Sequence, residues 1–215
     1  MATLELITQQ LELSEQLRAG RETMIEPQDL PGRFGRVVHD VDRVLGAINA
    51  PSVLAGGWAV WRHGYAARMT QDVDIVLAAK QLDHFLQTAS VVGFRVLSTK
   101  EGGWPKVHHK STDITVDILP EGGRPGVPTR LAPTLIRHPA EMGGTEAKLH
   151  YIALSALIEL KLAAGRARDD NDVIELIRSN STVADEIRSH LAAIHVAYVA
   201  QFDALAKRAA EDDQR

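Results

Sequence analysis

The chain has 215 residues, of which 45% are apolar and 24% are charged, and its formal net charge is −4. This composition is typical of a globular protein, and the acidic balance excludes one that coats nucleic acid by charge alone. The absence of cysteine excludes disulfides and thiolate metal sites. No apolar run reaches the length of a bilayer span and no secretory signal is recognisable, so we expect no membrane contact and a cytoplasmic location.

The spacing of apolar residues predicts helices first, then alternating strands and helices, then helices again. The expected helices lie within 1–30 and over 34–48, 58–65, 81–92, 155–167, 170–179 and 182–210, and the expected strands over 52–55, 72–78, 94–98, 106–110, 113–119 and 146–150. A Gly- and Pro-rich stretch at 120–145 predicts a long loop with a functional role or high mobility.

This order predicts an α+β fold with a mixed sheet flanked by helices and a helical C-terminal part. We divide the chain into N-terminal helices over 1–49, an α/β core over 50–150 and a helical region over 151–215.

Three aspartates carry the main functional signal. Asp72 and Asp74 are two residues apart in a strand, so their side chains point to the same face. Asp117, flanked by apolar residues in a second expected strand, is the best third member. Like charges this close repel unless a cation lies between them, and Mg²⁺ prefers such hard oxygen ligands. The three acids therefore predict a magnesium site, although a lone pair of strand acids also serves to block edge-to-edge aggregation.

Two features near these acids suit a phosphate group. Gly56 and Gly57 follow an apolar run, and glycine lets the backbone approach a phosphate closely; a tight strand-to-helix turn is the alternative. Arg68 lies four residues before Asp72 and is either a bidentate phosphate ligand or an ordinary surface arginine.

Lys161 lies in an otherwise apolar helical segment, between Leu160 and Leu162. A lysine in such surroundings needs a function or an acidic partner, because burying an unpaired charge is costly. It is expected either to reach a triphosphate or to pair with Asp172 or Glu159.

The segments LAGGWA (54–59), RMTQDVDI (68–75) and VDI (116–118) resemble the nucleotidyltransferase superfamily with the DNA polymerase β-like fold. The shared pattern is a glycine turn, a strand with two acids and a third acid on a nearby strand. The segment LIELKLAAGRARDDND (157–172) is similar to the AbiEii-type toxin nucleotidyltransferases and their uncharacterised relatives, which carry a helical lysine and an Arg-x-x-Asp-x-x-Asp stretch. The matching residues here are Lys161, Arg166, Asp169 and Asp172.

This resemblance implies an enzyme that moves a nucleoside monophosphate from an NTP to an acceptor hydroxyl, with Mg²⁺ as cofactor. It implies metal ligands at Asp72, Asp74 and Asp117, catalytic roles for these three with Lys161 and Asp172, and nucleotide binding by Gly56, Gly57, Arg68, Thr70 and Lys161. Asp117 is also the candidate general base. Asp172 is expected to activate the acceptor or to hold the lysine. The implied acceptor is tRNA or a protein, with a cognate antitoxin as partner.

Two alternatives stay open. The Gly-Gly-Trp-Ala form of the turn also resembles the lincosamide and small aminoglycoside nucleotidyltransferases, which favours a small hydroxyl compound as acceptor. Gly57 stands where family toxins often have serine, and the loss of that hydroxyl favours a nucleotide-binding relative without turnover.

Overall fold

The computed structural model describes residues 15, 20–68, 70–98, 103–127 and 129–212. The amphipathic helix expected within 1–30 falls largely outside these residues; in this part the structure describes the short 3-10 helix η1 (Pro27–Asp29). In the described part of the chain, no helix is both long enough and apolar enough to cross a lipid bilayer.

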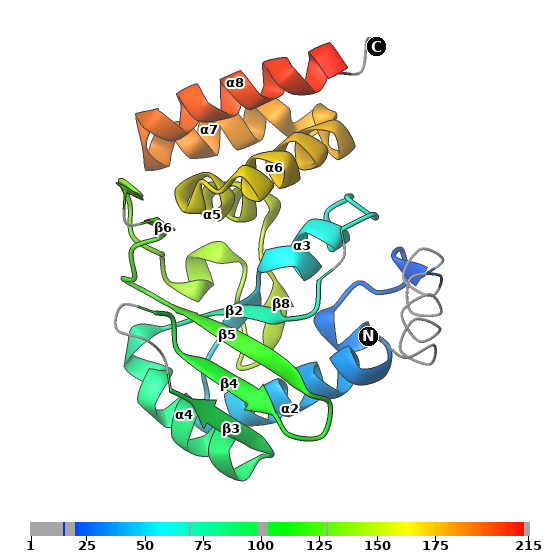
Figure 1. Ribbon diagram of the computed structural model, residues 1–215, viewed down its shortest axis with the longest axis vertical. Coiled ribbons are helices and arrows are strands. Elements are labelled where there is room, and N and C mark those ends of the chain that lie inside the picture. Colours follow the sequence, from blue (N-terminus) through cyan, green and yellow to red (C-terminus); the bar gives the residue numbers. More distant parts are fainter. Residues whose placement is uncertain (1–14, 16–19, 69, 99–102, 128, 213–215) are drawn as a thin grey trace.

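A six-stranded mixed sheet forms the centre of the molecule, with the strand order β3-β4-β5-β2-β1-β8 (Figure 1). The strands are β1 (Ser52–Leu54), β2 (Val73–Leu77), β3 (Phe94–Leu97), β4 (Lys106–His109), β5 (Ile114–Pro120) and β8 (Leu149–Tyr151). Strand β2 pairs in parallel with β5 and antiparallel with β1, while β1 pairs in parallel with β8. The α+β fold expected from the sequence is thereby confirmed.

Helices cover the sheet on both faces. Helices α2 (Gly32–Ile48) and α4 (Leu82–Val91) pack on one face, where Ile75 and Ile118 meet their apolar side chains. On the other face Val53 and Val76 pack with the C-terminal helices α5 (Leu154–Ala164), α6 (Ala167–Ser179), α7 (Ala184–Ile194) and α8 (Val196–Asp212). Figure 1 shows these two groups of helices at opposite ends of the view, with the sheet between them. The short helix α3 (Gly56–Arg62) follows β1 directly.

Period-2 alternation explains how one strand serves two layers. In β2 the side chains of Val73, Ile75 and Leu77 join the cluster under α2 and α4, while Val76 joins the opposite cluster. Each of the two apolar clusters combines side chains from more than one of the three predicted divisions of the chain. The division into 1–49, 50–150 and 151–215 stays a prediction.

Two sequence expectations were wrong in detail. The single helix expected over 182–210 is two helices, broken at His195, whose backbone is extended (φ −165°, ψ 132°). The break lets α8 fold back along α7, where Arg188 Nε lies 2.9 Å from Asp203 Oδ1. The stretch 120–145 is also not one long loop, since it holds the hairpin β6 (Gly126–Val127) and β7 (Arg130–Leu131) and the 3-10 helix η3 (Pro139–Met142). Tertiary packing decided both outcomes, and local propensity did not reveal them.

Candidate active site

The three aspartates singled out in the sequence lie together. Parallel pairing of β2 and β5 places Asp74 directly beside Asp117, and Asp72 immediately precedes β2 on the same side. One carboxylate oxygen from each residue lies within 4.8 Å of the other two. Two segments more than 40 residues apart in the chain thus supply one acidic cluster, and the register of the sheet fixes its geometry.

Within this cluster the Asp74 carboxyl has a raised pKa. Burial raises the pKa of Asp74 to about 6, and the charges of Asp72 and Asp117 contribute in the same direction. Lys161 and Arg166 act in the opposite sense and are weaker. A set of hard oxygen donors that repel one another is what a divalent cation of the Mg²⁺ type requires, so the residues present fit that ion.

Gly56 and Gly57 pack directly against residues of the acidic strand and its preceding turn. Gly56 has φ +60°, a conformation that favours glycine, and a Cβ atom there would overlap the Asp74 carboxylate, with Asp74 Cγ only 2.6 Å away. A Cβ atom at Gly57 would lie 2.6 Å from Thr70 Cβ. The Thr70 hydroxyl in turn donates a 2.6 Å hydrogen bond to Asp72 Oδ1. Close packing against Asp74 and Thr70 therefore explains both glycines, and a serine side chain at position 57 has no room.

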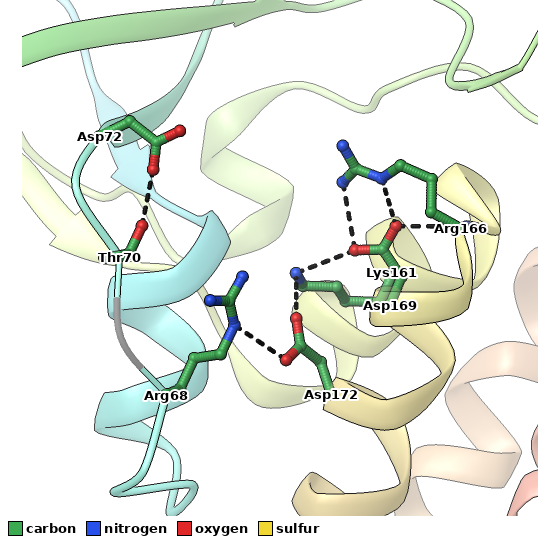
Figure 2. A network of polar contacts seen from close by, with 7 residues as sticks. All are labelled: Arg68, Thr70, Asp72, Lys161, Arg166, Asp169 and Asp172. Atoms are coloured by element: carbon green, nitrogen blue, oxygen red, sulfur yellow. Dashed lines mark hydrogen bonds and ion pairs between the residues drawn. The ribbon is translucent and has the colours of Figure 1, made fainter.

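Lys161 faces the acids from helix α5 and is held by two buried carboxylates (Figure 2). Its Nζ donates to Asp169 Oδ1 at 3.1 Å and to Asp172 Oδ2 at 2.7 Å. The two aspartates come from α6, which begins just after the left-handed turn at Gly165 (φ +61°). Of the two acidic partners considered from the sequence, Asp172 is the one observed.

The alternative partner, Glu159, is engaged elsewhere. Its carboxylate accepts a 2.8 Å hydrogen bond from Arg137 Nη2 and contacts His190 Nε2 at 3.0 Å.

Two arginines complete the network around Lys161. Arg68 Nε lies 2.9 Å from Asp172 Oδ1, and Arg166 donates to Asp169 through both Nε and Nη2. Burial alone would raise the pKa of Asp169, but the Arg166 hydrogen bond and the Lys161 charge outweigh it and leave this pKa lowered. Three cations share two carboxylates, so the network carries a net formal charge of +1 next to the acidic cluster.

A cavity of about 1010 Å³ is lined both by the acidic cluster and by residues of the cationic network around Lys161. The residues assigned from the sequence that line it are Gly56, Gly57, Arg68, Thr70, Asp72, Asp74, Asp117 and Lys161. Asp172 is absent from the lining, because it lies behind Lys161 and Arg68 and contacts both. Of the two expectations for Asp172, its position agrees with holding the lysine.

The sequence interpretation missed Lys106. Its Nζ lies 2.8 Å from Asp117 Oδ1 and 2.9 Å from Asp117 Oδ2, because antiparallel pairing of β4 with β5 places the two residues opposite each other. A signal was present: a hairpin over the two expected strands, with its turn near Thr112, brings positions 106 and 117 together.

No protein-family model and no curated protein sequence matches this chain. Among solved structures, it is similar to the crystal structure of ANT(2")-Ia in complex with adenylyl-2"-tobramycin, with 19% identity, coverage of 74% of this chain and 94% of that chain, and a TM-score of 0.49. The solution structure of the antibiotic-resistance factor ANT(2'')-Ia gives 16% identity, 83% and 94% coverage and a TM-score of 0.43. An antigenic nucleotidyltransferase-like protein from Paracoccidioides brasiliensis gives 14% identity, 80% and 91% coverage and a TM-score of 0.43. The case for a function therefore comes from the side chains of this chain.

Proposed function

We propose that this protein is a nucleotidyltransferase that moves a nucleoside monophosphate from an NTP to an acceptor hydroxyl. The observation that carries the proposal is the facing arrangement of three carboxylates and a cationic network across one cavity. Nucleotidyl transfer needs little covalent help from the protein; it needs the triphosphate held in line and its developing charge neutralised. Acids that hold a cation on one side and basic groups on the other meet both needs.

In this proposal Asp72, Asp74 and Asp117 would hold Mg²⁺. The bound ion would neutralise charge on the phosphates and orient the reacting oxygens. Lys161 has three N–H donors, and since its two aspartates account for two, one remains for a phosphate oxygen. The backbone at Gly56 and Gly57 lines the cavity without side chains and allows the triphosphate to approach closely.

The bond changes follow from this placement. The acceptor oxygen attacks the α-phosphorus, the bond from that phosphorus to the bridging oxygen breaks, and pyrophosphate leaves. The hydroxyl proton needs a base, and Asp117 is our candidate. Each carboxylate oxygen has more than one acceptor position, so Asp117 can accept from Lys106 and retain capacity for an ion and a proton.

For the acceptor we propose the end of an RNA, with tRNA as the first candidate. Arg33 and Arg168 line the cavity, and no acid within the described ranges pairs with either of them. Such cations favour an anionic acceptor. A small hydroxyl compound of the antibiotic type is the second candidate, since pockets of roughly 300–1,000 Å³ suit compounds of drug size, and this cavity reaches about 1010 Å³.

A transfer assay tests the proposal. Each α-³²P-labelled NTP is incubated with Mg²⁺ and total tRNA, cell protein or a panel of aminoglycosides and lincosamides. Wild type is run beside Asp74→Asn, with Asp83→Asn as the control, because Asp83 is exposed and does not line the cavity. Label that appears in RNA with the wild type and with the control, but not with Asp74→Asn, supports the proposal. Label in a small compound moves the acceptor assignment to the second candidate. No label in any acceptor, with Mg²⁺-dependent NTP binding also absent, overturns the enzyme assignment.

A toxin role with a cognate antitoxin is the biological setting that we propose for RNA transfer. Induced expression is then expected to arrest growth, and the arrest is expected to depend on Asp74. Growth arrest that persists in the Asp74→Asn variant would contradict a role through nucleotide transfer.

A further inference from the structure

The cavity of the candidate active site changes from polar to apolar along strand β5. Side chains on one face of a strand alternate, and those of β5 that line the cavity are Thr115, Asp117 and Leu119. Beyond Asp117 the lining is therefore apolar on this strand, and helix α5 supplies further apolar residues opposite it. The apolar side chains of this end are Leu97, Trp104, Leu119, Pro125, Leu157 and Leu160.

Trp104 belongs to this apolar end because the pairing of β4 with β5 continues beyond the end of β4. The register places Lys106 opposite Asp117. One residue further, the Ile118 N–H donates a 2.9 Å hydrogen bond to the Pro105 carbonyl oxygen. The next position toward the N-terminus, Trp104, therefore lies on the same face as Lys106, about two residues along the sheet from Asp117.

The indole ring of Trp104 is held at its edge and is accessible from the cavity. A Cβ atom at Gly123 would lie 2.5 Å from Trp104 Cζ3, so the ring packs on the bare backbone of that glycine. The Trp104 side chain is only partly buried. Phe34 is the other aromatic residue among the described residues that line the cavity, but it is 1% exposed and packs on Trp58 with 4.5 Å between the ring centroids. Trp104 is thus the aromatic ring that a ligand in this cavity can contact.

The triphosphate of the proposed function belongs to the opposite side of the acids. Gly56 packs on the Asp74 carboxylate, and the charges of Lys161 and Arg166 act on the same carboxyl group. The sheet order β4-β5-β2-β1 sets the glycine turn after β1 on one side of the acids and the residues of β4 on the other. Phosphates bound by the glycine turn and Lys161 leave Asp117 and the apolar end free for the acceptor.

We propose that Trp104 is the stacking platform for the terminal base of an RNA acceptor, and that stacking there sets the ribose hydroxyl of the same nucleotide against Asp117. The inference rests on the proposed function and deepens its choice of acceptor. Two residues along a strand span roughly 7 Å, close to the separation of base and 3′ hydroxyl in one nucleoside. Base stacking on an aromatic side chain contributes to binding whichever base is present. An aminoglycoside, which is a polycation without a flat ring, gains no such contact and meets the charge of Lys106.

A binding comparison that removes the base from the RNA and the aromatic ring from the protein tests the proposal. Two short 5′-fluorescein-labelled RNAs are used, identical except that one ends in adenosine and the other in an abasic ribose, and their Kd values are measured by fluorescence anisotropy. The proteins are wild type, Trp104→Leu, which keeps an apolar side chain against Gly123, and Trp104→Phe, which keeps an aromatic face. Tyr65→Leu is the matched control, because Tyr65 is also a partly buried aromatic residue packed on the apolar core but does not line the cavity.

Two further measurements accompany these Kd values. Circular dichroism confirms that each variant is folded. Calorimetry with α,β-methylene-ATP and Mg²⁺ gives the nucleotide affinity of each protein in the absence of RNA, which separates a loss of acceptor binding from a loss of NTP binding.

We expect wild type and Tyr65→Leu to bind the intact RNA end about 5- to 150-fold more tightly than the abasic end. Trp104→Phe is expected to keep a preference, and Trp104→Leu to bind both ends equally with an unchanged affinity for the nucleotide. A wild type that does not distinguish the two ends, or a Trp104→Leu variant that still does, would overturn the proposal and leave the proposed function standing. Weaker nucleotide binding by Trp104→Leu with unchanged RNA binding would overturn it too, since the ring would then serve the base of the NTP. Absence of label transfer by wild type to every acceptor would overturn the proposed function itself, and the acceptor role of Trp104 with it.

Discussion

Removing the charge of Asp74 is expected to stabilise the protein while abolishing its metal site. The folded state holds the pKa of Asp74 at about 6, compared with an ordinary value of 3.8. Each pKa unit corresponds to about 1.4 kcal/mol, so ionised Asp74 destabilises the metal-free fold by roughly 3 kcal/mol at most. Solvent reaches part of this carboxylate at the cavity wall, which makes this figure an upper value.

The sign of the pH dependence follows from the raised pKa. Between about pH 4 and pH 6 the unfolded chain has lost the Asp74 proton and the folded chain retains it, so stability falls as the pH rises through this window. The Asp74→Asn variant lacks this loss. Its advantage over wild type is therefore expected to be largest above pH 7 and to shrink toward pH 4.

Thermal unfolding in EDTA at pH 4.5 and pH 8 measures the effect. At pH 8 Asp74→Asn is expected to unfold at a midpoint temperature several degrees above wild type, since 1 kcal/mol corresponds to about 2–4 °C at this chain length. Asp113→Asn is the matched control, because the Asp113 side chain is 92% exposed and its replacement is expected to change stability by no more than about 0.5 kcal/mol.

Adding Mg²⁺ is expected to cancel most of the stability difference between the two proteins. At a hundredfold excess over Kd, wild type is expected to gain about 2.7 kcal/mol and Asp74→Asn almost nothing. An Asp74→Asn variant less stable than wild type at pH 8 in EDTA would refute the reasoning, and so would an equal Mg²⁺ response in the two proteins.

Three further substitutions test the packing of the site. Lys161→Met removes the shared partner of two buried carboxylates and is expected to lower the free energy of unfolding in urea by about 3 kcal/mol. The control Lys207→Met, at an exposed lysine, is expected to lower it by less than about 0.5 kcal/mol. Equal effects of the two substitutions would contradict a buried network. Gly56→Ala is expected to cost more stability than Gly122→Ala and to lose Mn²⁺ binding: both glycines have positive φ, but only at Gly56 does an added Cβ meet another side chain. Gly57→Ser is expected to lower nucleotide affinity in calorimetry, because it displaces Thr70, and a gain in affinity would show that the site accommodates the hydroxyl.

Local signals were enough for a large part of the fold. The apolar runs and their flanking glycines placed α2, β1, β2, α4 and β5 to within a few residues, since each of these elements has a clear period and is buried as that period requires. The same local rule placed Asp72 and Asp74 side by side.

Prediction from the sequence failed where local residues favoured two alternatives equally. Nothing near His195 prevents a continuous helix, and the break there appears only because α8 packs back on α7. The partner of Lys161 was equally open, since Glu159 and Asp172 were both within reach of a helical lysine; packing of α6 against α5 selected Asp172 and added Asp169.

The sequence by itself determined which side chains can do chemistry here: two acids on one strand face, a third acid in an apolar strand, a glycine turn and a lysine in an apolar helix. Only the tertiary structure decided how they meet. Parallel pairing of β2 with β5 brought Asp117 beside Asp74, and antiparallel pairing with β4 added Lys106 to Asp117. Alternation along a strand depends on neighbouring residues alone, whereas the partner of a strand depends on which arrangement of the whole chain buries the most apolar surface.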